Sequence, residues 1–173
     1  PTAPISLMID IADQSIVKIS AQRYSTQKRR LHLDDPQDWG TAPILNQQVE
    51  LGSYLLTLEA EGYETTYYPI LVEREHGWSI TPPESNQPSP IQMIPVGVIP
   101  KGFSYVPAGW FYTGGDSLVS NNLAHKRRIW VDGFIMAIKH VTHRDYLYFL
   151  NALCAQGQTQ RAYELRPRLR DEE

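Results

Sequence analysis

FSYVPAGWFYTGG (residues 103–115) is followed, after a polar loop, by RRIWVDGFIMAIKHVTHRDYLYFLNAL (residues 127–153). Aromatic and apolar residues on either side of the Pro107-Ala108-Gly109 turn predict two short strands. The second stretch opens with a longer predicted strand, which is interrupted at Asp132-Gly133. The polar loop that joins the two stretches is expected at residues 117–124. The second half of the chain is therefore predicted to contain a few strands joined by turns.

A helix is predicted near the end of the second stretch. Thr142 is a good N-cap residue, and Asp145, three residues later, completes a capping box. The helix is expected to run to about Ala155, with Gly157 just beyond its end. Its apolar side chains recur at helical spacing, and they include the single cysteine of the chain, which we interpret as a small buried hydrophobe. These side chains are Tyr146, Leu147, Phe149, Leu150, Leu153 and Cys154.

The order of these motifs resembles the opening of the formylglycine-generating enzyme/sulfatase-modifying family. The matching patterns are V-P-A-G-x-F-x-x-G, R-R-x-W-V-D-x-F and V-T-x-x-x-Y-x-x-F-L. The resemblance implies a mixed α/β fold related to C-type lectins. In active members it also implies copper-assisted oxidation of a peptide cysteine by a pair of active-site cysteines. The positions that carry over belong to the scaffold: Val106, Pro107, Ala108, Gly109, Gly114, Val131, Asp132, Phe134, Val141, Thr142, Tyr146, Phe149 and Leu150.

No catalytic, cofactor-binding or metal-binding residue carries over from that family. Its redox cysteines lie near the far end of a longer domain, whereas this chain has only Cys154, inside the predicted helix. His143 stands where the family commonly has asparagine. The resemblance therefore implies that residues 101–173 are the truncated start of such a domain. We expect the remaining part of that domain, or a second chain, to cover its core.

Residues 1–81 predict an antiparallel β sandwich. Apolar and polar residues alternate over 5–11 and 15–20, on either side of a turn at 12–14. The pattern ELGSYLLTLEAEGY (residues 50–63) resembles PEGA-type carbohydrate- or peptidoglycan-associated β modules. Glycine permits the tight turns, and tyrosine buries its ring while its hydroxyl stays hydrated. A plain antiparallel sandwich without this relationship would show the same pattern.

A proline-rich stretch separates the two halves. Seven of the thirteen prolines lie between residues 81 and 107, which excludes regular helix from most of that range. We place a linker at 82–100, between a β-sandwich module (1–81) and the sulfatase-modifying-like part (101–173). Alternating apolar residues at 91–96 predict an edge strand in the second half of this linker. The predicted fold class is mainly β with minor α.

Composition and charge argue against several classes of partner. A net charge of −3 and a pI near 6.0 give no reason to expect nucleic acid. No apolar run approaches the roughly 20 residues of a membrane-spanning helix. No motif indicates a cofactor or a metal, and one cysteine leaves no pair for an internal disulfide. We expect a cytoplasmic protein without a membrane span.

Trp39 and Trp78 are the candidate contact residues. Both lie in stretches whose composition predicts loops. Aromatic side chains there can stack on a sugar or a peptide, but they also serve as local packing anchors. The sequence leaves both interpretations of these tryptophans open.

Three functions from different classes are consistent with these observations. We favour a non-catalytic recognition or accessory region of a larger multidomain bacterial protein, binding a protein, peptide or other ligand. Such an arrangement resembles the tails of bacterial serine/threonine kinases. The second hypothesis is a fragment of a formylglycine-generating-type oxidase whose catalytic cysteines lie beyond residue 173. The third is a purely structural β domain.

Overall fold

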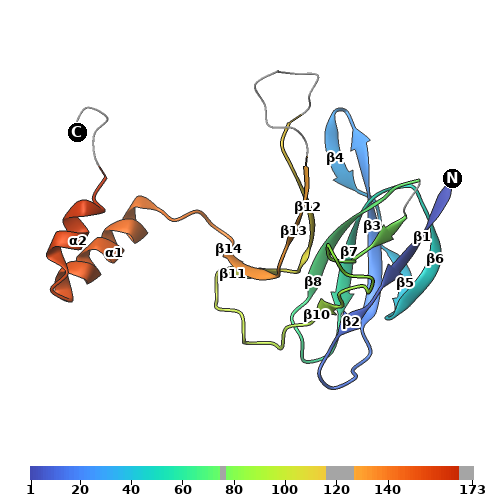
Figure 1. The fold of residues 1–173 in the computed structure, drawn as a ribbon, viewed down its shortest axis with the longest axis horizontal. Helices are drawn as coiled ribbons and strands as arrows, with labels where there is room; N and C mark the ends of the chain where they lie inside the picture. Colours follow the sequence, from blue (N-terminus) through green and yellow to red (C-terminus); the bar gives the residue numbers. More distant parts are fainter. Residues whose placement is uncertain (75–76, 116–126, 168–173) are drawn as a thin grey trace. The chain divides into compact units, whose positions relative to one another are not determined.

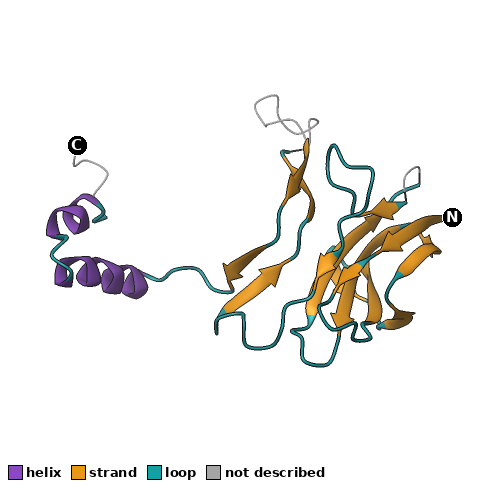
Figure 2. Ribbon diagram, turned by 60° about the horizontal axis from the view of Figure 1, so that its bottom comes forward, coloured by secondary structure: helices purple, strands orange, loops and turns teal. Residues whose placement is uncertain are grey.

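The computed structural model describes residues 1–74, 77–115 and 127–167. In these ranges the chain is mainly β, as predicted, with two short helices (Figure 1). It divides into two compact units, Pro1–Met136 and Ala137–Glu173. Both helices belong to the second unit (Figure 2). The polar loop expected at residues 117–124 lies outside the described residues.

Strand β1 (Thr2–Leu7) is the centre of a three-stranded sheet in the first unit. It pairs antiparallel with β6 (Ile44–Glu50) and parallel with β9 (Trp78–Ser79). Because successive side chains of a strand point to opposite faces, every second residue of β1 enters the core. The buried side chains of β1 are Ala3, Ile5 and Leu7.

Five strands form the larger sheet: β3 (Lys18–Gln27), β4 (Arg30–Leu33), β5 (Gln37–Thr41), β7 (Gly52–Glu59) and β8 (Thr66–Val72). One edge of β3 pairs antiparallel with β7. The other edge pairs with β5 near the start of β3 and with β4 near its end. Strand β8 lies at the edge of the sheet, where Pro69 is tolerated because proline has no N–H to donate to a second neighbour.

One buried cluster draws its side chains from both sheets. Leu56 and Leu58 of β7 are fully buried, as is Leu7 of β1. Burying a side chain of this size contributes about 1.5–3 kcal/mol before the entropy of ordering the chain is counted. Buried and exposed residues alternate along β8, as expected for a strand that has one face against the core.

Residues 82–100, the expected linker, belong to the first compact unit. Within them β10 (Ile91–Gln92) pairs parallel with β2 (Ile9–Asp10). The amide of Met93 donates to the carbonyl of Asp10 at 2.9 Å, and the Met93 side chain is buried. The strand predicted in the second half of the linker is therefore present and contributes to the core. The division of the chain into modules at this stretch stays a prediction.

The motif FSYVPAGWFYTGG forms one arm of a long bent β ribbon. Strand β11 (Phe103–Val106) pairs with β14 (Phe134–Ala137), and β12 (Gly109–Thr113) pairs antiparallel with β13 (Arg127–Val131). The turn predicted at Pro107-Ala108-Gly109 lies where β11 gives way to β12. The interruption predicted at Asp132-Gly133 lies between β13 and β14. The Pro107-Ala108-Gly109 turn consequently bends its arm and does not reverse the chain.

The second unit contains α1 (His143–Ala155) and α2 (Thr159–Glu164). The predicted capping box of α1 is confirmed. The Asp145 amide donates to Thr142 Oγ1 at 3.2 Å, and the Thr142 amide donates to Asp145 Oδ2 at 2.9 Å. No helix in the described ranges has both the length and the apolar character needed to cross a membrane.

Cys154 is exposed, so its interpretation as a buried hydrophobe is wrong. Among the described residues of α1, Leu153 is the only buried side chain, and Ala162 is its buried counterpart on α2. Cys154 follows Leu153 and lies about 100° farther round the helix, outside this narrow contact. Leu147 and Phe149, which belong to the same predicted apolar face, are also exposed.

The capping box should make the start of α1 sensitive to acid. Hydrogen bonds from Thr142 hold the pKa of Asp145 below its ordinary value of 3.8. The stabilisation is complete above that ordinary pKa and is lost as the pH falls through the lower pKa of the folded state. We expect amide hydrogen exchange, corrected for intrinsic rates, to show weaker protection of residues 143–146 at about pH 2.5 than at about pH 6. Asp145→Asn, which does not titrate, should remove this difference. An unchanged protection ratio in the unsubstituted protein would contradict the prediction.

Candidate functional site

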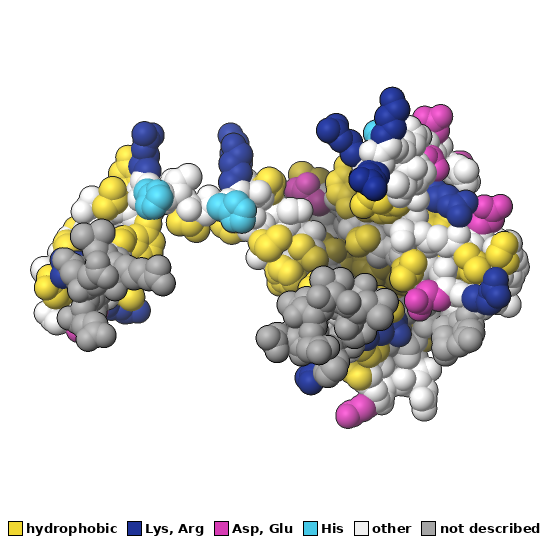
Figure 3. Space-filling model, turned by 90° about the horizontal axis from the view of Figure 1, so that it is seen from above, with side chains coloured by type: hydrophobic (Ala, Val, Ile, Leu, Met, Phe, Trp, Pro, Cys, Tyr) yellow, Lys and Arg dark blue, Asp and Glu magenta, His cyan; other side chains and the backbone are white. Residues whose placement is uncertain are grey.

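A groove with a volume of about 960 Å³ opens on the first unit. Residues of β7, β8, β9 and the β3–β4 hairpin line it on one side, and residues of β12 and β13 line it on the other. Figure 3 shows hydrophobic side chains in the hollow beside the hairpin, whose end is basic. Among the described residues, the aromatic and cationic ones in the lining are Tyr24, Tyr54, Trp78, Trp110, Tyr112 and Arg128.

The larger sheet gives the groove an apolar wall. Alternate residues of β8 point into the core, so Pro69 and Leu71 lie on the opposite face of the strand. Ser53 of β7 is the cross-strand partner of Leu71. Leu31 from the hairpin extends this wall and is 73% exposed. This wall therefore offers aliphatic surface that a ligand can cover.

The ribbon gives the groove an aromatic wall. Trp110 pairs with Trp130 and Tyr112 pairs with Arg128 across β12 and β13, so the four side chains share one face of the ribbon. The two indole rings meet edge to face, with their centroids 5.6 Å apart. The guanidinium carbon of Arg128 lies 4.3 Å from the centroid of the Trp110 ring, in cation–π geometry. This wall thus combines aromatic surface with a positive charge.

Two hydrogen bonds hold the ribbon wall in place. Trp110 Nε1 donates to the Thr81 carbonyl at 2.9 Å, and the Tyr68 hydroxyl donates to the Ala108 carbonyl at 3.0 Å. Burial, and to a smaller extent the neighbouring Tyr105, raises the pKa of Tyr68 far above its ordinary value. The Tyr68 hydroxyl therefore remains a donor at neutral pH. Both contacts indicate a groove whose two walls are already in position, as is usual for ligand sites.

Trp78 lines the groove, whereas Trp39 is not part of its lining. The loops expected around both residues are wrong, because Trp39 lies in β5 and Trp78 lies in β9. Trp39 is the extra residue of a β-bulge opposite β3, and the Gly40 amide donates to Asp38 Oδ1 at 2.8 Å there. Asp38 and Gly40, which often occur in turns, give the bulge the composition of a loop. Trp78 becomes part of a strand only through pairing with β1, which is far away in the sequence.

Both tryptophans also act as packing anchors. Trp39 contacts Tyr54 with ring centroids 5.4 Å apart, and Trp78 contacts Tyr68 with centroids 5.5 Å apart. Each tryptophan is partly buried against the core. The two residues are therefore alike in packing and differ in their access to the groove. That difference makes them a matched pair for experiment.

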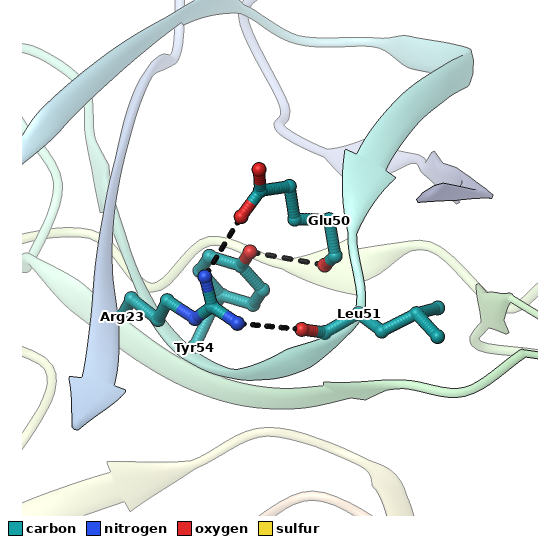
Figure 4. A network of polar contacts seen from close by, with 4 residues as sticks. All are labelled: Arg23, Glu50, Leu51 and Tyr54. Atoms are coloured by element: carbon teal, nitrogen blue, oxygen red, sulfur yellow. Dashed lines mark hydrogen bonds and ion pairs between the residues drawn. The ribbon is translucent and has the colours of Figure 1, made fainter. Parts of the chain in front are cut away.

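A network around Arg23 fixes Tyr54 in the groove lining (Figure 4). Arg23 donates to Glu50 Oε2 and to the Leu51 carbonyl, both at 2.8 Å, and the Tyr54 hydroxyl donates to the Glu50 carbonyl at 3.0 Å. Burial raises the pKa of Tyr54, although the Arg23 charge opposes this shift. Three of these residues belong to the ELGSY motif. Arg23 is not evident from the sequence because it lies on β3, far from that motif.

Trp110, Tyr112 and Arg128 are groove residues that the sequence did not single out as contact residues. Alternation within each strand could have placed them on one face, but the register between the two arms is needed to bring them together. Within 1–74, 77–115 and 127–167, no group of three His, Cys, Asp or Glu side chains is arranged to hold a metal ion. The groove is thus defined by aromatic, aliphatic and cationic groups.

Residues 35–83 match the model of the PEGA domain. The matched range contains β5 to β9 and therefore the parts of the groove that β7, β8 and β9 provide. It does not include β1 and β3, the central strands of the two sheets that share the core. No curated protein and no solved structure matches the chain. The match supports the PEGA-like module inferred from the ELGSY region.

Proposed function

We propose that this chain is a non-catalytic recognition region that binds an extended segment of a partner protein in the groove. The observation that carries the proposal is the composite lining, in which the PEGA-matching segment and the β ribbon each provide one wall. A volume of about 960 Å³ and a mainly apolar and aromatic lining are typical of ligand sites. The hydrogen bonds from Tyr68 and Trp110 support a groove that exists before the ligand arrives.

The lining favours a peptide over a neutral sugar. Pro69, Leu71 and Leu31 offer aliphatic surface suited to apolar side chains. The described lining has one carboxylate, Glu73, and no Asn or Gln, so its other hydrogen-bonding side chains are hydroxyl groups, indole N–H groups and the Arg128 guanidinium. Edge strands such as β8 are also the elements along which extended peptides bind.

The wider context is part of the same proposal. Residues 1–81 would form a PEGA-like β sandwich, and residues 101–173 would begin a sulfatase-modifying-type domain within a larger cytoplasmic bacterial protein, such as a multidomain serine/threonine kinase. The remaining part of that domain, or a second chain, would cover its apolar surface. Support comes from large apolar side chains of β14 and α1 that are between 42% and 67% exposed. These are Phe134, Ile135, Met136, Leu147, Tyr148 and Phe149.

Replacing Trp78 should impair binding far more than replacing Trp39. Trp78→Ala removes an aromatic side chain from the groove lining, and a buried aromatic anchor of this kind contributes about 2 kcal/mol, or roughly 30-fold in affinity. Trp39→Ala removes a similar ring–ring contact with the lining residue Tyr54, but Trp39 does not itself line the groove, so this variant should lower stability with a much smaller loss of affinity. Fluorescence anisotropy of fluorescein-labelled degenerate nine-residue peptide mixtures, titrated with the full chain, measures the effect.

Urea unfolding of both variants provides the control for stability. We expect similar losses in the free energy of unfolding, because each tryptophan packs against one tyrosine and part of the core. Equal losses of affinity in the two variants would assign Trp78 a packing role only. Absence of binding to every peptide mixture would remove the proposed function itself.

A further inference from the structure

We infer, on the basis of the proposed peptide-recognition function, that the groove selects an acidic peptide: one with a carboxylate next to an apolar or aromatic side chain. Arg128 would bind the carboxylate, while the aliphatic wall of β8 and the hairpin would accept the neighbouring side chain. The inference names the chemistry of the ligand, which the groove's shape alone does not specify.

The position of Arg128 is the first observation. Its guanidinium lies over the face of Trp110, which restrains a long flexible side chain at the groove wall. A guanidinium that stacks through its face keeps its N–H groups in the plane, where they can bind both oxygens of a carboxylate. Among the described residues, the one ion pair within 4.0 Å joins Arg23 to Glu50. No described carboxylate therefore lies that close to the nitrogen atoms of Arg128. Arg128 is thus a pre-positioned cation for a carboxylate of the ligand.

The β3–β4 hairpin adds positive charge on the other side of the groove. Its exposed end carries Lys28, Arg29 and Arg30, immediately before Leu31, which lines the groove. Figure 3 shows a group of basic side chains beside the hydrophobic hollow. Among the described lining residues, Arg128 is the one cation and Glu73 is the one carboxylate, so the basic end of the hairpin adds positive charge outside the lining. Arg128 and the basic hairpin end therefore offer a ligand carboxylate two sources of positive charge, even though the net charge of the whole chain is −3.

Three peptide mixtures test the inference. Each is fluorescein-labelled and nine residues long, with leucine or phenylalanine beside a central position that is fixed as glutamate, glutamine or lysine. The full chain is expected to bind the glutamate mixture about tenfold more tightly than the glutamine mixture, which is the scale of one charge-assisted hydrogen-bonded contact. Arg128→Gln should abolish this preference, so that the variant binds the glutamate and glutamine mixtures with equal affinity.

Arg127→Gln is the matched control. Arg127 is the preceding residue of β13, so its side chain points to the other face of the ribbon, and it has the same charge. This variant should keep the tenfold preference for glutamate. Circular dichroism spectra of both variants establish that each is folded.

The outcomes separate the inference from the function on which it rests. Equal affinity of the unsubstituted chain for the glutamate and glutamine mixtures would overturn the acidic preference and leave peptide recognition intact. A glutamate preference that survives Arg128→Gln, or that Arg127→Gln removes equally, would also overturn the role of Arg128. Binding of polygalacturonate with no binding of any peptide mixture would overturn both the inference and the proposed peptide function.

Discussion

Gly77→Ala is expected to destabilise the first unit by about 2–5 kcal/mol. Gly77 has a φ of +59°, a conformation that costs an L-residue about 1–2 kcal/mol. A Cβ at this position would also collide with the carbonyl oxygen of Pro4. That oxygen belongs to the backbone of β1, so relief requires separation of β1 from the start of β9, at an overpacking cost of about 1–3 kcal/mol.

Gly62→Ala is the matched control for this prediction. Gly62 also has a positive φ, +79°, but an added Cβ would meet no atom within 4 Å. The free energy of unfolding of this variant should fall only by the cost of the positive φ, about 1–2 kcal/mol. Urea unfolding followed by tryptophan fluorescence gives both free energies. If the two glycine variants lose the same stability, the contact between Gly77 and Pro4 has no energetic importance.

Gly109→Ala is expected to cost about 1–3 kcal/mol by forcing the ribbon away from Tyr68. A Cβ on Gly109 would lie 2.6 Å from the Tyr68 hydroxyl oxygen. Tyr68 cannot easily move aside, because its side chain is 5% exposed and its hydroxyl donates to the Ala108 carbonyl. The same displacement would disturb the groove, since the next residue, Trp110, lines it.

Removing the Tyr68 hydroxyl should rescue this variant. Tyr68→Phe alone is expected to cost about 1 kcal/mol, because it deletes one hydrogen bond to a partly buried carbonyl. In the Gly109→Ala background the same change removes the colliding atom, and the next atom of that ring lies at an ordinary 3.5 Å. The double variant should therefore be more stable than Gly109→Ala alone. A double-mutant cycle measures this coupling, and additive losses would show that the hydroxyl is not the obstacle.

Local signals were sufficient for several elements of the fold. The alternation over residues 5–11 and 15–20 predicted strands in the segments where β1, β2 and β3 lie. The capping box of α1 was predicted from Thr142 and Asp145 because the interaction spans only three residues. The strand at Ile91–Gln92 was predicted within a proline-rich stretch from alternation alone. In each case the residues that interact, or the period that they follow, lie within one short segment.

The burial of Cys154 and the loops around the two tryptophans were predicted wrongly for a common reason. The two tryptophans depend on strand partners that are remote in the sequence. Cys154 depends on how much of the surface of α1 is covered by α2. α1 packs through a narrow contact with α2, which leaves Cys154 exposed. Trp78 enters a strand through β1, and Trp39 is accommodated by a bulge opposite β3. Composition near these residues contains no information about such partners.

The amino-acid sequence by itself determined a mainly β chain, a PEGA-like pattern around residues 50–63, and a capped helix at Thr142. These features depend on alternation, glycine placement and capping, which act over a few neighbouring residues. Only the tertiary structure decided that Trp78, Trp110 and Arg128 meet in one groove while Trp39 stays outside it. A groove between two walls depends on strand register and long-range pairing, and a shift of one residue would turn these side chains to the other face.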